Sequence, residues 1–371
     1  MTESPLNTPR IALVRSRATG AFERRVARSL ASHVDPDAPI VVACSGGPDS
    51  LATLVAVART RPTGSVTAAH FDHRLRTSHE VATERALVEQ VCAVLGTGFL
   101  GGRAARVPVD HGEAAAREAR YRWLARACAE AGATVCVTGH TLDDQAETVL
   151  LRLVRGTGVG GASGMSPASD WPVPLRGVRA STLVRPLLGV ERAEVEAYLV
   201  ALGLSAAHDP SNDTLDYARN RVRQRVVPEL RLVNRRAPAQ IAAFADRARA
   251  DDAALHAWAV EVFSSIAQVE RDPAGIRLDR RALLDLPEAV ATRVVRLAGE
   301  RLGVTLDSAR ADATLHAAHA RGRRAALGQD TEAARQGDAL VIRRAPGRSG
   351  ESPRQSLPEG VAHTGGSREA P

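Results

Sequence analysis

The sequence contains no lysine, so all 49 of its basic side chains are arginines. This absence excludes Schiff-base chemistry and any phosphate clamp built on a lysine, because both need an ε-amine. Phosphate contacts must therefore come from arginine guanidinium groups or from backbone amides. A genome-wide drift toward Arg and Ala codons explains most of the replacement.

Aromatic residues and long apolar runs are also scarce. Aromatics make up 3% of the chain, which leaves Leu, Val and Ala to fill the interior and argues against base-stacking platforms. No apolar run approaches the ~20 residues of a membrane span, and the N-terminus lacks a signal-peptide core. We expect a cytoplasmic protein. The cysteines show no CxxC or paired metal-ligand spacing, so we expect buried free thiols at Cys44, Cys92, Cys128 and Cys136.

What the chain does have is size and positive charge. Its 371 residues with 44% hydrophobic content are enough for two domains with real cores. The formal net charge of +7 indicates a polyanionic partner.

The most informative stretch is Ser45-Gly46-Gly47-Pro48-Asp49-Ser50. It follows an apolar strand pattern at 40–44 and precedes a helix pattern at 51–58. Two glycines let backbone amides crowd around an anion, and a helix N-terminus adds partial positive charge. No lysine follows, so this is not a Walker A loop. We expect a pyrophosphate cradle in which Asp49 holds Mg²⁺ and Ser45 and Ser50 offer hydroxyls; a capped strand-to-helix turn is the alternative.

From residue 40 onward, short apolar strands alternate with longer helical stretches, as a doubly wound parallel sheet requires. Further strands are expected at 66–70, within 96–107, at 134–138 and at 183–187, and helices at 21–30, 78–95, 113–131, 143–154 (capped by Asp143), 191–202 and 219–227. The fold class is therefore α/β with a doubly wound parallel sheet, followed by a smaller helical domain.

The pattern divides the chain into four parts. Residues 1–38 form an N-terminal lead-in and helix, and residues 39–227 form the catalytic domain. Residues 228–322 form a helical, arginine-rich domain expected to contact nucleic acid, with helices at 240–269 and 283–302 and a strand at 276–278. Residues 323–371 form a short C-terminal segment with a lone strand at 338–343 and a disordered tail.

Polar side chains follow three of the predicted strands. The glycine loop, His70 and His140 each lie just past a strand end, where open α/β sheets bind ligands. We expect one site there. For His70, Asp72 and His73, a nucleotide-contacting loop is favoured over a metal site.

A pair of acids follows His140. Asp144 and Glu147 are three residues apart on one helix face, where they can bind a cation or take a proton from an amine. The alternative is that the two acids only complement the positive end of the helix dipole. On the preceding helix, Arg120 can neutralise charge on an attacked α-phosphate, whereas Arg117 fits a solvated helix face. The glycine-rich run at 156–165 suits a phosphate loop, a lid or a linker equally.

The glycine loop resembles the PP-loop of N-type ATP pyrophosphatases, an adenine nucleotide alpha hydrolase-like fold. Across residues 38–230 the chain is similar, more narrowly, to the tRNA(Ile)-lysidine synthetase family. The motifs that carry this resemblance are His70–Arg76, Ala116–Tyr121, His140–Gly156, Arg185–Leu188, Asp209–Asn212 and Arg219–Arg223.

The resemblance implies an ATP-dependent ligase that adenylates the wobble cytidine of the CAU-anticodon isoleucine tRNA and then joins free L-lysine to its C2, releasing AMP and diphosphate. It implies catalytic roles for Asp49, Arg120, Asp144 and Glu147, the last two binding lysine. It implies ATP contacts at Ser45, Gly46, Gly47, Pro48, Asp49, Ser50, His70, His140, Asn212, Asn220 and Arg223, with Mg²⁺ held through the phosphates. A homodimer is left open. The alternatives are another PP-loop tRNA-modifying enzyme, such as a thiolase, or a non-catalytic RNA-binding protein.

Overall fold

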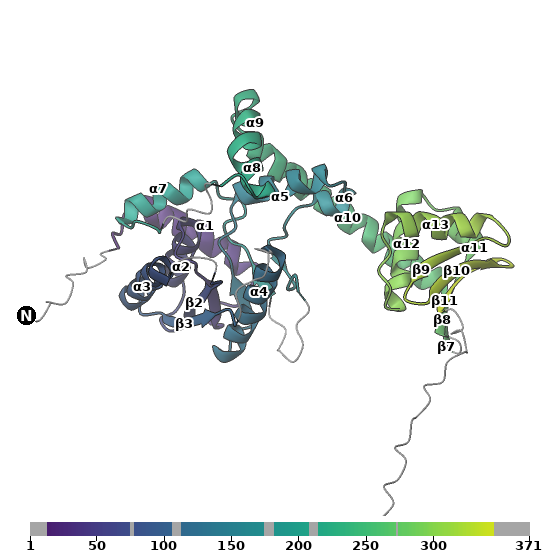
Figure 1. The fold of residues 1–371 in the computed structure, drawn as a ribbon, viewed down its shortest axis with the longest axis horizontal. Helices are drawn as coiled ribbons and strands as arrows, with labels where there is room; N and C mark the ends of the chain where they lie inside the picture. Colours follow the sequence, from purple (N-terminus) through teal and green to yellow (C-terminus); the bar gives the residue numbers. More distant parts are fainter. Residues whose placement is uncertain are drawn as a thin grey trace, which may run out of the picture. The chain divides into compact units, whose positions relative to one another are not determined.

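The computed structural model describes residues 13–74, 78–105, 113–173, 182–207, 214–271 and 274–344. The chain divides into two compact units, residues 1–252 and 253–371 (Figure 1). Within the described residues, no helix is both long and apolar enough to cross a bilayer.

Unit 1 is built on a six-stranded sheet with the strand order β3-β2-β1-β4-β6-β5. Its strands are β1 (Ile40–Ala43), β2 (Val66–Asp72), β3 (Gly98–Arg103), β4 (Val135–Val137), β5 (Ala168–Ser169) and β6 (Thr182–Val184). All neighbouring strands pair in parallel except β5 with β6, which is antiparallel. The predicted doubly wound parallel sheet is therefore confirmed, with one short antiparallel edge strand added.

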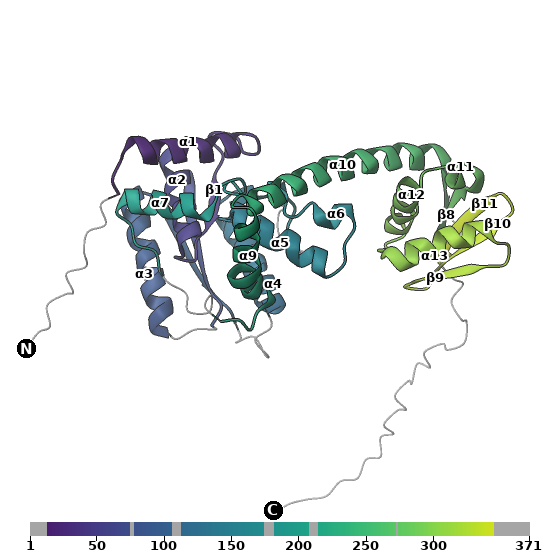
Figure 2. The ribbon, with the colours of Figure 1, turned by 90° about the horizontal axis from the view of Figure 1, so that it is seen from above.

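Helices cover both faces of this sheet (Figures 1 and 2). One face packs against α1 (Arg17–Ala31), α2 (Pro48–Thr60), α3 (Ser78–Leu95) and α7 (Arg192–Leu202), whose apolar side chains share one core with the strands. The other face packs against α4 (Glu113–Glu130), where Tyr121 and Leu124 meet Val41 and Leu183. The central strands β1 and β4 are buried on both faces, which explains their continuous rather than alternating apolar pattern, whereas the outer strand β3 is partly exposed.

The helix that carries the acid pair, α5 (Leu142–Val154), begins one residue earlier than the sequence predicts. Its N-cap is Thr141, whose hydroxyl accepts a hydrogen bond from the Asp144 amide in a capping box. The prediction that Asp143 caps this helix is therefore wrong. The Asp143 carboxylate instead accepts hydrogen bonds from the Arg192 backbone amide and from Arg231.

The predicted basic helix at 219–227 is a series of three segments. They are α8 (Ala218–Arg221), a π-helical turn (Val222–Val226) and α9 (Val227–Val233). A short α6 (Val159–Ala162) lies within the glycine-rich run, and the long α10 (Ala237–Ile266) begins in unit 1 and ends in unit 2. π-Turns are rare and commonly mark functional sites, and this one carries Arg223.

Unit 2 contains helices, as predicted, and the strand predicted at 276–278 lies within β8, but it also contains a full sheet that the sequence did not predict. Five antiparallel strands run in the order β7-β8-β11-β10-β9. They are β7 (Ala267–Arg271), β8 (Ala274–Asp279), β9 (Arg324–Gly328), β10 (Thr331–Gln336) and β11 (Ala339–Arg344). The strand predicted to stand alone at 338–343 is β11, and it pairs with both β8 and β10.

Three helices complete unit 2: α11 (Arg280–Leu284), α12 (Glu288–Arg301) and α13 (Ser308–His319). Leu278, Leu340 and Ile342 of the sheet share a buried core with Val294 of α12 and Ala317 of α13. The division between the units at 252/253 falls inside α10, whereas the sequence placed boundaries at 228 and 322. The division at 322 separates strands of one sheet.

Candidate active site

The glycine loop joins β1 to α2 and is folded by its own serines. The Ser45 amide donates to the Ser50 hydroxyl at 3.1 Å, and that hydroxyl donates to the Gly47 carbonyl at 2.9 Å. Gly46 has a φ of +89°, a left-handed conformation that favours glycine, and a Cβ there would lie 3.3 Å from Glu84 Cβ. Gly47 is the N-cap of α2 and Pro48 its first residue. The loop therefore presents a helix N-terminus to whatever binds above it.

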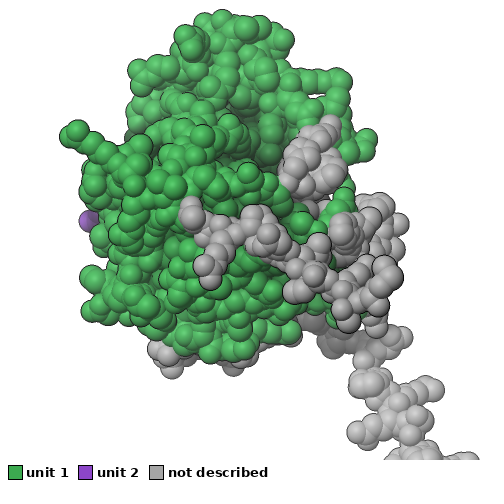
Figure 3. Space-filling model, turned by 90° about the vertical axis from the view of Figure 1, so that its left-hand side faces the viewer, with its two compact units in different colours: residues 1–252 green, residues 253–371 purple. Residues whose placement is uncertain are grey.

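A cavity of about 710 Å³ opens over this loop at the carboxyl ends of the parallel strands. Figure 3 shows one face of unit 1, the part of the molecule that contains the cavity, as a space-filling surface. Among the predicted site residues, its lining contains Ser45, Gly47, Pro48, Asp49, Ser50, His70, Arg120, His140, Asp144 and Arg223. The clusters that follow separate strands in the sequence are thus brought into one cavity.

The remaining predicted residues lie elsewhere. Gly46 is a buried residue of the loop and Glu147 is 1% exposed, and neither belongs to the cavity lining. Asn220 is buried and donates from Nδ2 to the Thr214 carbonyl at 2.9 Å, outside the lining. Asn212 lies outside the described residues, together with the rest of its motif at 209–211.

Gly139 lets strand β4 and helix α2 approach closely. A Cβ at this position would lie 2.6 Å from the Asp49 carbonyl oxygen and 2.8 Å from Thr53 Oγ1. Both distances are shorter than any real Cβ contact, so a larger residue would push the segment carrying His140 away from the glycine loop. Because Gly139 has no side chain, the segment carrying His140 can lie close to the glycine loop.

Asp49 holds an unused carboxylate oxygen at the cavity. Its Oδ1 is buried and makes no hydrogen bond, while Oδ2 lies 3.5 Å from Arg192 Nη2. Burial raises the pKa of Asp49 to about 6, Arg192 opposing this rise and Asp144 reinforcing it. A hard, orphaned carboxylate oxygen beside a phosphate cradle is a fitting ligand for Mg²⁺, so the residues present fit the expected cation.

The acid pair is enclosed by arginines. Asp144 Oδ1 accepts from Arg219, Arg223 and Arg192 at 3.0, 3.1 and 3.3 Å. The two Glu147 carboxylate oxygens accept from Arg223 Nε at 2.6 Å and from Arg219 Nε at 2.9 Å. Three guanidinium groups therefore face two buried carboxylates.

Asp144 complements the start of α5, one of the two alternatives that the sequence left open, while its role toward an amine stays a prediction. Its Oδ2 accepts from the Thr141 amide and hydroxyl, each at 2.9 Å, and so caps α5. Its Oδ1 meets the arginines. Burial alone would raise the pKa of Asp144, but Arg219 and Arg192 outweigh it and hold that pKa well below its ordinary value. Asp144 is therefore an anion at any physiological pH and a weak base.

Among the described residues, three histidines line the cavity: His70 on β2, His73 just after it, and His140 after β4. His140 Nδ1 lies 2.9 Å from the Thr138 hydroxyl, and burial lowers the pKa of His140 to about 3, so its ring is neutral. His70 Nδ1 lies 3.0 Å from the Cys44 carbonyl oxygen. Asp72 turns away to pair with Arg103 at 2.9 Å and to accept from the Arg74 amide. The geometry thus separates Asp72 from the two histidines of its motif.

The glycine-rich run after α5 is held by side chains of unit 1. Gln145 donates to the Met165 carbonyl at 3.0 Å and accepts from the Met165 amide at 2.7 Å. Arg152 donates to the carbonyls of Gly161 and Gly164, and Arg249 to those of Ser163 and Met165. The sequence left open a phosphate loop, a lid or a linker for this run. These contacts favour a linker that is fixed to unit 1.

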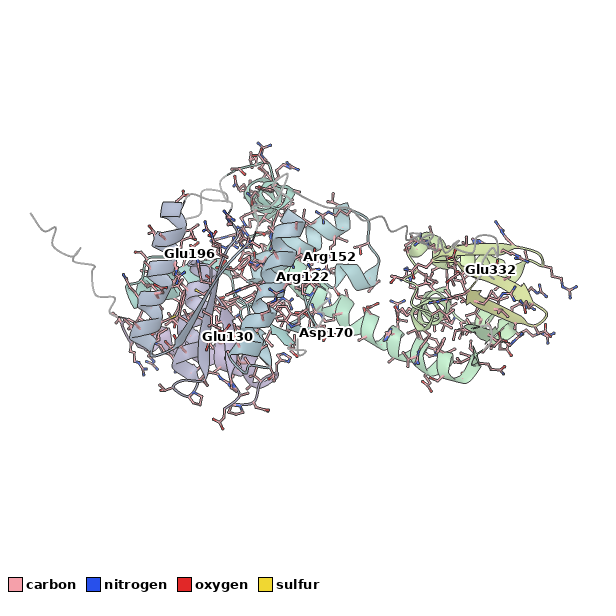
Figure 4. The ribbon with its side chains drawn as sticks, turned by 60° about the horizontal axis from the view of Figure 1, so that its bottom comes forward. Arg122, Glu130, Arg152, Asp170, Glu196 and Glu332 are labelled. Carbon is pink, nitrogen blue, oxygen red and sulfur yellow. The ribbon has the colours of Figure 1, made fainter. Side chains whose placement is uncertain are left out.

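Sequence reasoning assigned no role to Arg192 or Arg219. Arg192 begins α7 and reaches Asp49, Asp144 and Glu147. Nothing in its local sequence marks it, because its contacts with Asp143 and Asp144 of α5 are made only in the tertiary structure. Arg219 did carry a signal, since it belongs to the basic motif that also contains Arg223. Glu196, one turn after Arg192, also lines the cavity (Figure 4).

Comparison with known protein families gives a match to the PP-loop domain over residues 19–230. The chain is 40% identical over 261 residues to a tRNA(Ile)-lysidine synthase of Methylobacterium nodulans, covering 69% of this chain and 73% of that protein. It is 40% identical over 296 residues to a tRNA(Ile)-lysidine synthase of Salinispora arenicola, covering 76% and 82%. The Gloeobacter violaceus tRNA(Ile)-lysidine synthase is 37% identical over 276 residues, covering 74% and 80%.

Among solved structures, the chain resembles a U34-tRNA thiolase of Methanococcus maripaludis with a TM-score of 0.50 and 16% identity, covering 62% of this chain and 79% of that one. At this identity the likeness shows the fold alone. It agrees with the fold of unit 1.

Proposed function

Because the chain belongs to the PP-loop domain family and, within it, to the tRNA(Ile)-lysidine synthases, we propose how its cavity carries out that reaction. The enzyme is an ATP-dependent ligase that acts on isoleucine tRNA with a CAU anticodon. In the first step the O2 oxygen of the wobble cytidine attacks the α-phosphate of ATP and pyrophosphate leaves. In the second, the amine of free lysine attacks C2, the C2–O bond breaks and AMP leaves.

The first step uses the glycine loop. Its backbone amides and the N-terminus of α2 receive the pyrophosphate. The unpartnered Oδ1 of Asp49 is the group we propose to hold Mg²⁺, which when bound would offset charge on the phosphate oxygens. Arg120 lines the same cavity and makes no hydrogen bond within the described residues, which leaves its guanidinium free to stabilise charge at the attacked phosphate.

The second step needs a neutral amine. A lysine amine placed beside Asp144 would also lie near Arg192, Arg219 and Arg223, whose positive charges lower the pKa of a neighbouring amine. We propose that the carboxylates of Asp144 and Glu147 position the amine while these arginines favour its neutral form. The amine loses its proton as the N–C2 bond forms, and we assign the acid pair, which reaches the cavity through Asp144, as the acceptor.

The single observation that carries this proposal is the meeting of Asp49 and Asp144 in one cavity, each from the helix that follows a neighbouring parallel strand. Adenylation and amine transfer can then act on one cytidine without moving the tRNA between sites. We further propose that the arginine-rich region at 228–322 contacts the tRNA.

The test is a complete reaction with ATP, labelled free lysine and an isoleucine tRNA transcript bearing CAU. We expect label on the tRNA and release of AMP, and no label on a matched transcript whose wobble cytidine is replaced by uridine. Release of AMP without tRNA-bound lysine would contradict the proposed ligase reaction.

The two alternative functions, a PP-loop thiolase and a non-catalytic RNA-binding protein, account for fewer of the observations. A PP-loop thiolase shares the fold, as the Methanococcus maripaludis structure illustrates, but the extended sequence similarity is to lysidine synthases. A non-catalytic RNA-binding protein would need neither the phosphate cradle nor a buried acid pair. Neither alternative is favoured.

A further inference from the structure

A second group of arginines lies beside the cavity and has no acidic partner among the residues that the structure describes. Arg117 and Arg120 of α4 place their guanidinium carbons 4.9 and 5.2 Å from the centre of the Tyr121 ring. Arg185 follows β6, two residues after Leu183, which packs in the same cluster as Tyr121. Residues two apart in an extended segment point to the same side, so Arg185 faces α4 as well.

The arginine cluster, defined as Arg117, Arg120, Arg152 and Arg185, differs from the other interior arginines of unit 1. Arg192, Arg219 and Arg223 each pair with a buried carboxylate, and Arg59 pairs with the half-buried Glu23. Across the described ranges, no Asp or Glu forms an ion pair with a member of the arginine cluster. A buried charge without a counter-charge is unfavourable, so an anion is missing from this group.

Unused donors mark where that anion would bind. Arg185 is 6% exposed and donates from Nη1 to the Ser166 carbonyl and Ser169 hydroxyl, but its Nε is buried and has no partner in the described part of the chain. The same holds for Arg120 Nε and for the hydroxyl of Tyr121, which is fully buried. Arg117 makes no hydrogen bond to any described residue. Burial and the nearby Arg117 and Arg152 lower the pKa of Arg185, although Tyr121 opposes them.

We propose that the arginine cluster binds a phosphodiester group of the tRNA next to the reacting cytidine, an inference that rests on the proposed function. Arg120 lines the nucleotide cavity, whereas Arg117, Arg152 and Arg185 do not. The cluster lies toward β6, two strands from the glycine loop of β1, which is about 10 Å at the usual strand spacing. The planar guanidinium group of an arginine can donate two parallel hydrogen bonds to phosphate oxygens. Because the arginine cluster lies beyond Arg120, it would hold the RNA backbone while the cytosine base enters the cavity.

The test compares Arg117→Gln with Arg126→Gln. Arg126 is exposed and lies nine residues further along α4, on the opposite side of the helix. Each variant is titrated with the CAU isoleucine tRNA transcript over a range of salt concentrations, and separately with ATP, without turnover. Arg117→Gln should weaken tRNA binding about tenfold, as loss of one charge-assisted contact does, and should lower the log–log salt slope by about one. Arg126→Gln should bind tRNA like the wild type, and ATP affinity should be unchanged in both.

Two results would overturn the proposal. An unchanged tRNA affinity and salt slope in Arg117→Gln would make the cluster structural, and a weakened ATP affinity would assign it to the nucleotide. Because Arg185→Gln removes a buried group that also fastens β5, Arg117→Gln is the primary variant, and Arg117→Lys, which keeps the charge without the fork, should restore part of the affinity.

This binding test is independent of lysine transfer. If the wild type fails to transfer lysine but Arg117→Gln still loses salt-dependent tRNA binding, the phosphodiester site stands and the proposed reaction fails. If lysine is transferred and Arg117→Gln binds tRNA normally, the reaction stands and the phosphodiester site fails.

Discussion

At the scale of single residues, the site is governed by how charge is arranged around Asp49, Asp144 and Glu147. The sequence predicted these three acids and the glycine loop because their chemistry is local: loop, helix start and strand end are adjacent in the chain. It did not predict Arg192, whose guanidinium reaches Asp49 and Asp144 across tertiary structure. Local pattern cannot show which distant cation neutralises a buried acid.

We expect Asp49→Ala to abolish AMP release while leaving tRNA affinity nearly intact. The variant removes the oxygen assigned to Mg²⁺, and loss of an electrostatic contact at a phosphoryl centre costs roughly 10²–10³ in rate. AMP release and tRNA binding are measured side by side, with exposed Asp37→Ala as the matched control. Full activity in Asp49→Ala would contradict its assignment.

His140 predicts a specific pH dependence of stability. Its folded pKa of about 3 lies below the ordinary 6.5, so between these values the unfolded chain binds more protons than the native one. The free energy of unfolding should therefore rise with pH across this window, by up to about 1.4 kcal/mol per pH unit from this group. Denaturant unfolding of wild type and His140→Gln between pH 4.5 and 6.5 checks this. Identical slopes would mean that His140 titrates normally.

At the scale of elements, the strands and most helices of unit 1 were predictable because periodicity and parallel-strand burial leave a clear pattern. The residues at which these elements begin and end were less predictable. Thr141 caps α5 in place of Asp143, because a hydroxyl and the Asp144 carboxylate complete a capping box there. The π-turn at Val222–Val226 has no signature in composition. Of the unit 2 strands, β8 and β11 were predicted at 276–278 and 338–343, whereas β7, β9 and β10 were missed where alanine and arginine gave a helical texture to segments whose pairing is non-local.

Gly139 links two elements, so its substitution should damage the site as well as the fold. Gly139→Ala would place a Cβ 2.6 Å from the Asp49 carbonyl oxygen, and we expect a loss of about 1–3 kcal/mol from overpacking with a clear drop in ATP affinity. Gly189→Ala is the control, because a Cβ there meets nothing within 4 Å. Thermal unfolding and ATP titration measure both. Equal behaviour of the two variants would show that the approach of β4 to α2 is not tight.

At the scale of the whole molecule, the two units have separate cores, one around the parallel sheet and one around the antiparallel sheet. The cavity over the glycine loop lies within unit 1. Composition and charge anticipated a second domain and a polyanionic partner. They could not fix where the units divide, because the division falls within one continuous helix.

Separate cores predict that damage to unit 2 leaves ATP binding intact. Leu340 is fully buried in the unit 2 core, and Leu340→Ala should cost about 2–5 kcal/mol there. Calorimetry should show a lowered unfolding transition for unit 2, while ATP titration at 25 °C should match the wild type. A collapse of ATP affinity at a temperature where unit 2 is still folded would contradict the independence of the two cores.

The central claim is that one cavity divides adenylation and lysine transfer between different residues. Glu147→Gln tests it most directly, because it removes a charge from the acid pair without touching the glycine loop. With ATP labelled at the α-phosphate and the CAU isoleucine tRNA, this variant should accumulate labelled, adenylated tRNA and fail to pass it to free lysine. Equal loss of both half-reactions with collapsed ATP affinity would move Glu147 into the nucleotide site, and near-normal turnover would reduce it to a structural acid.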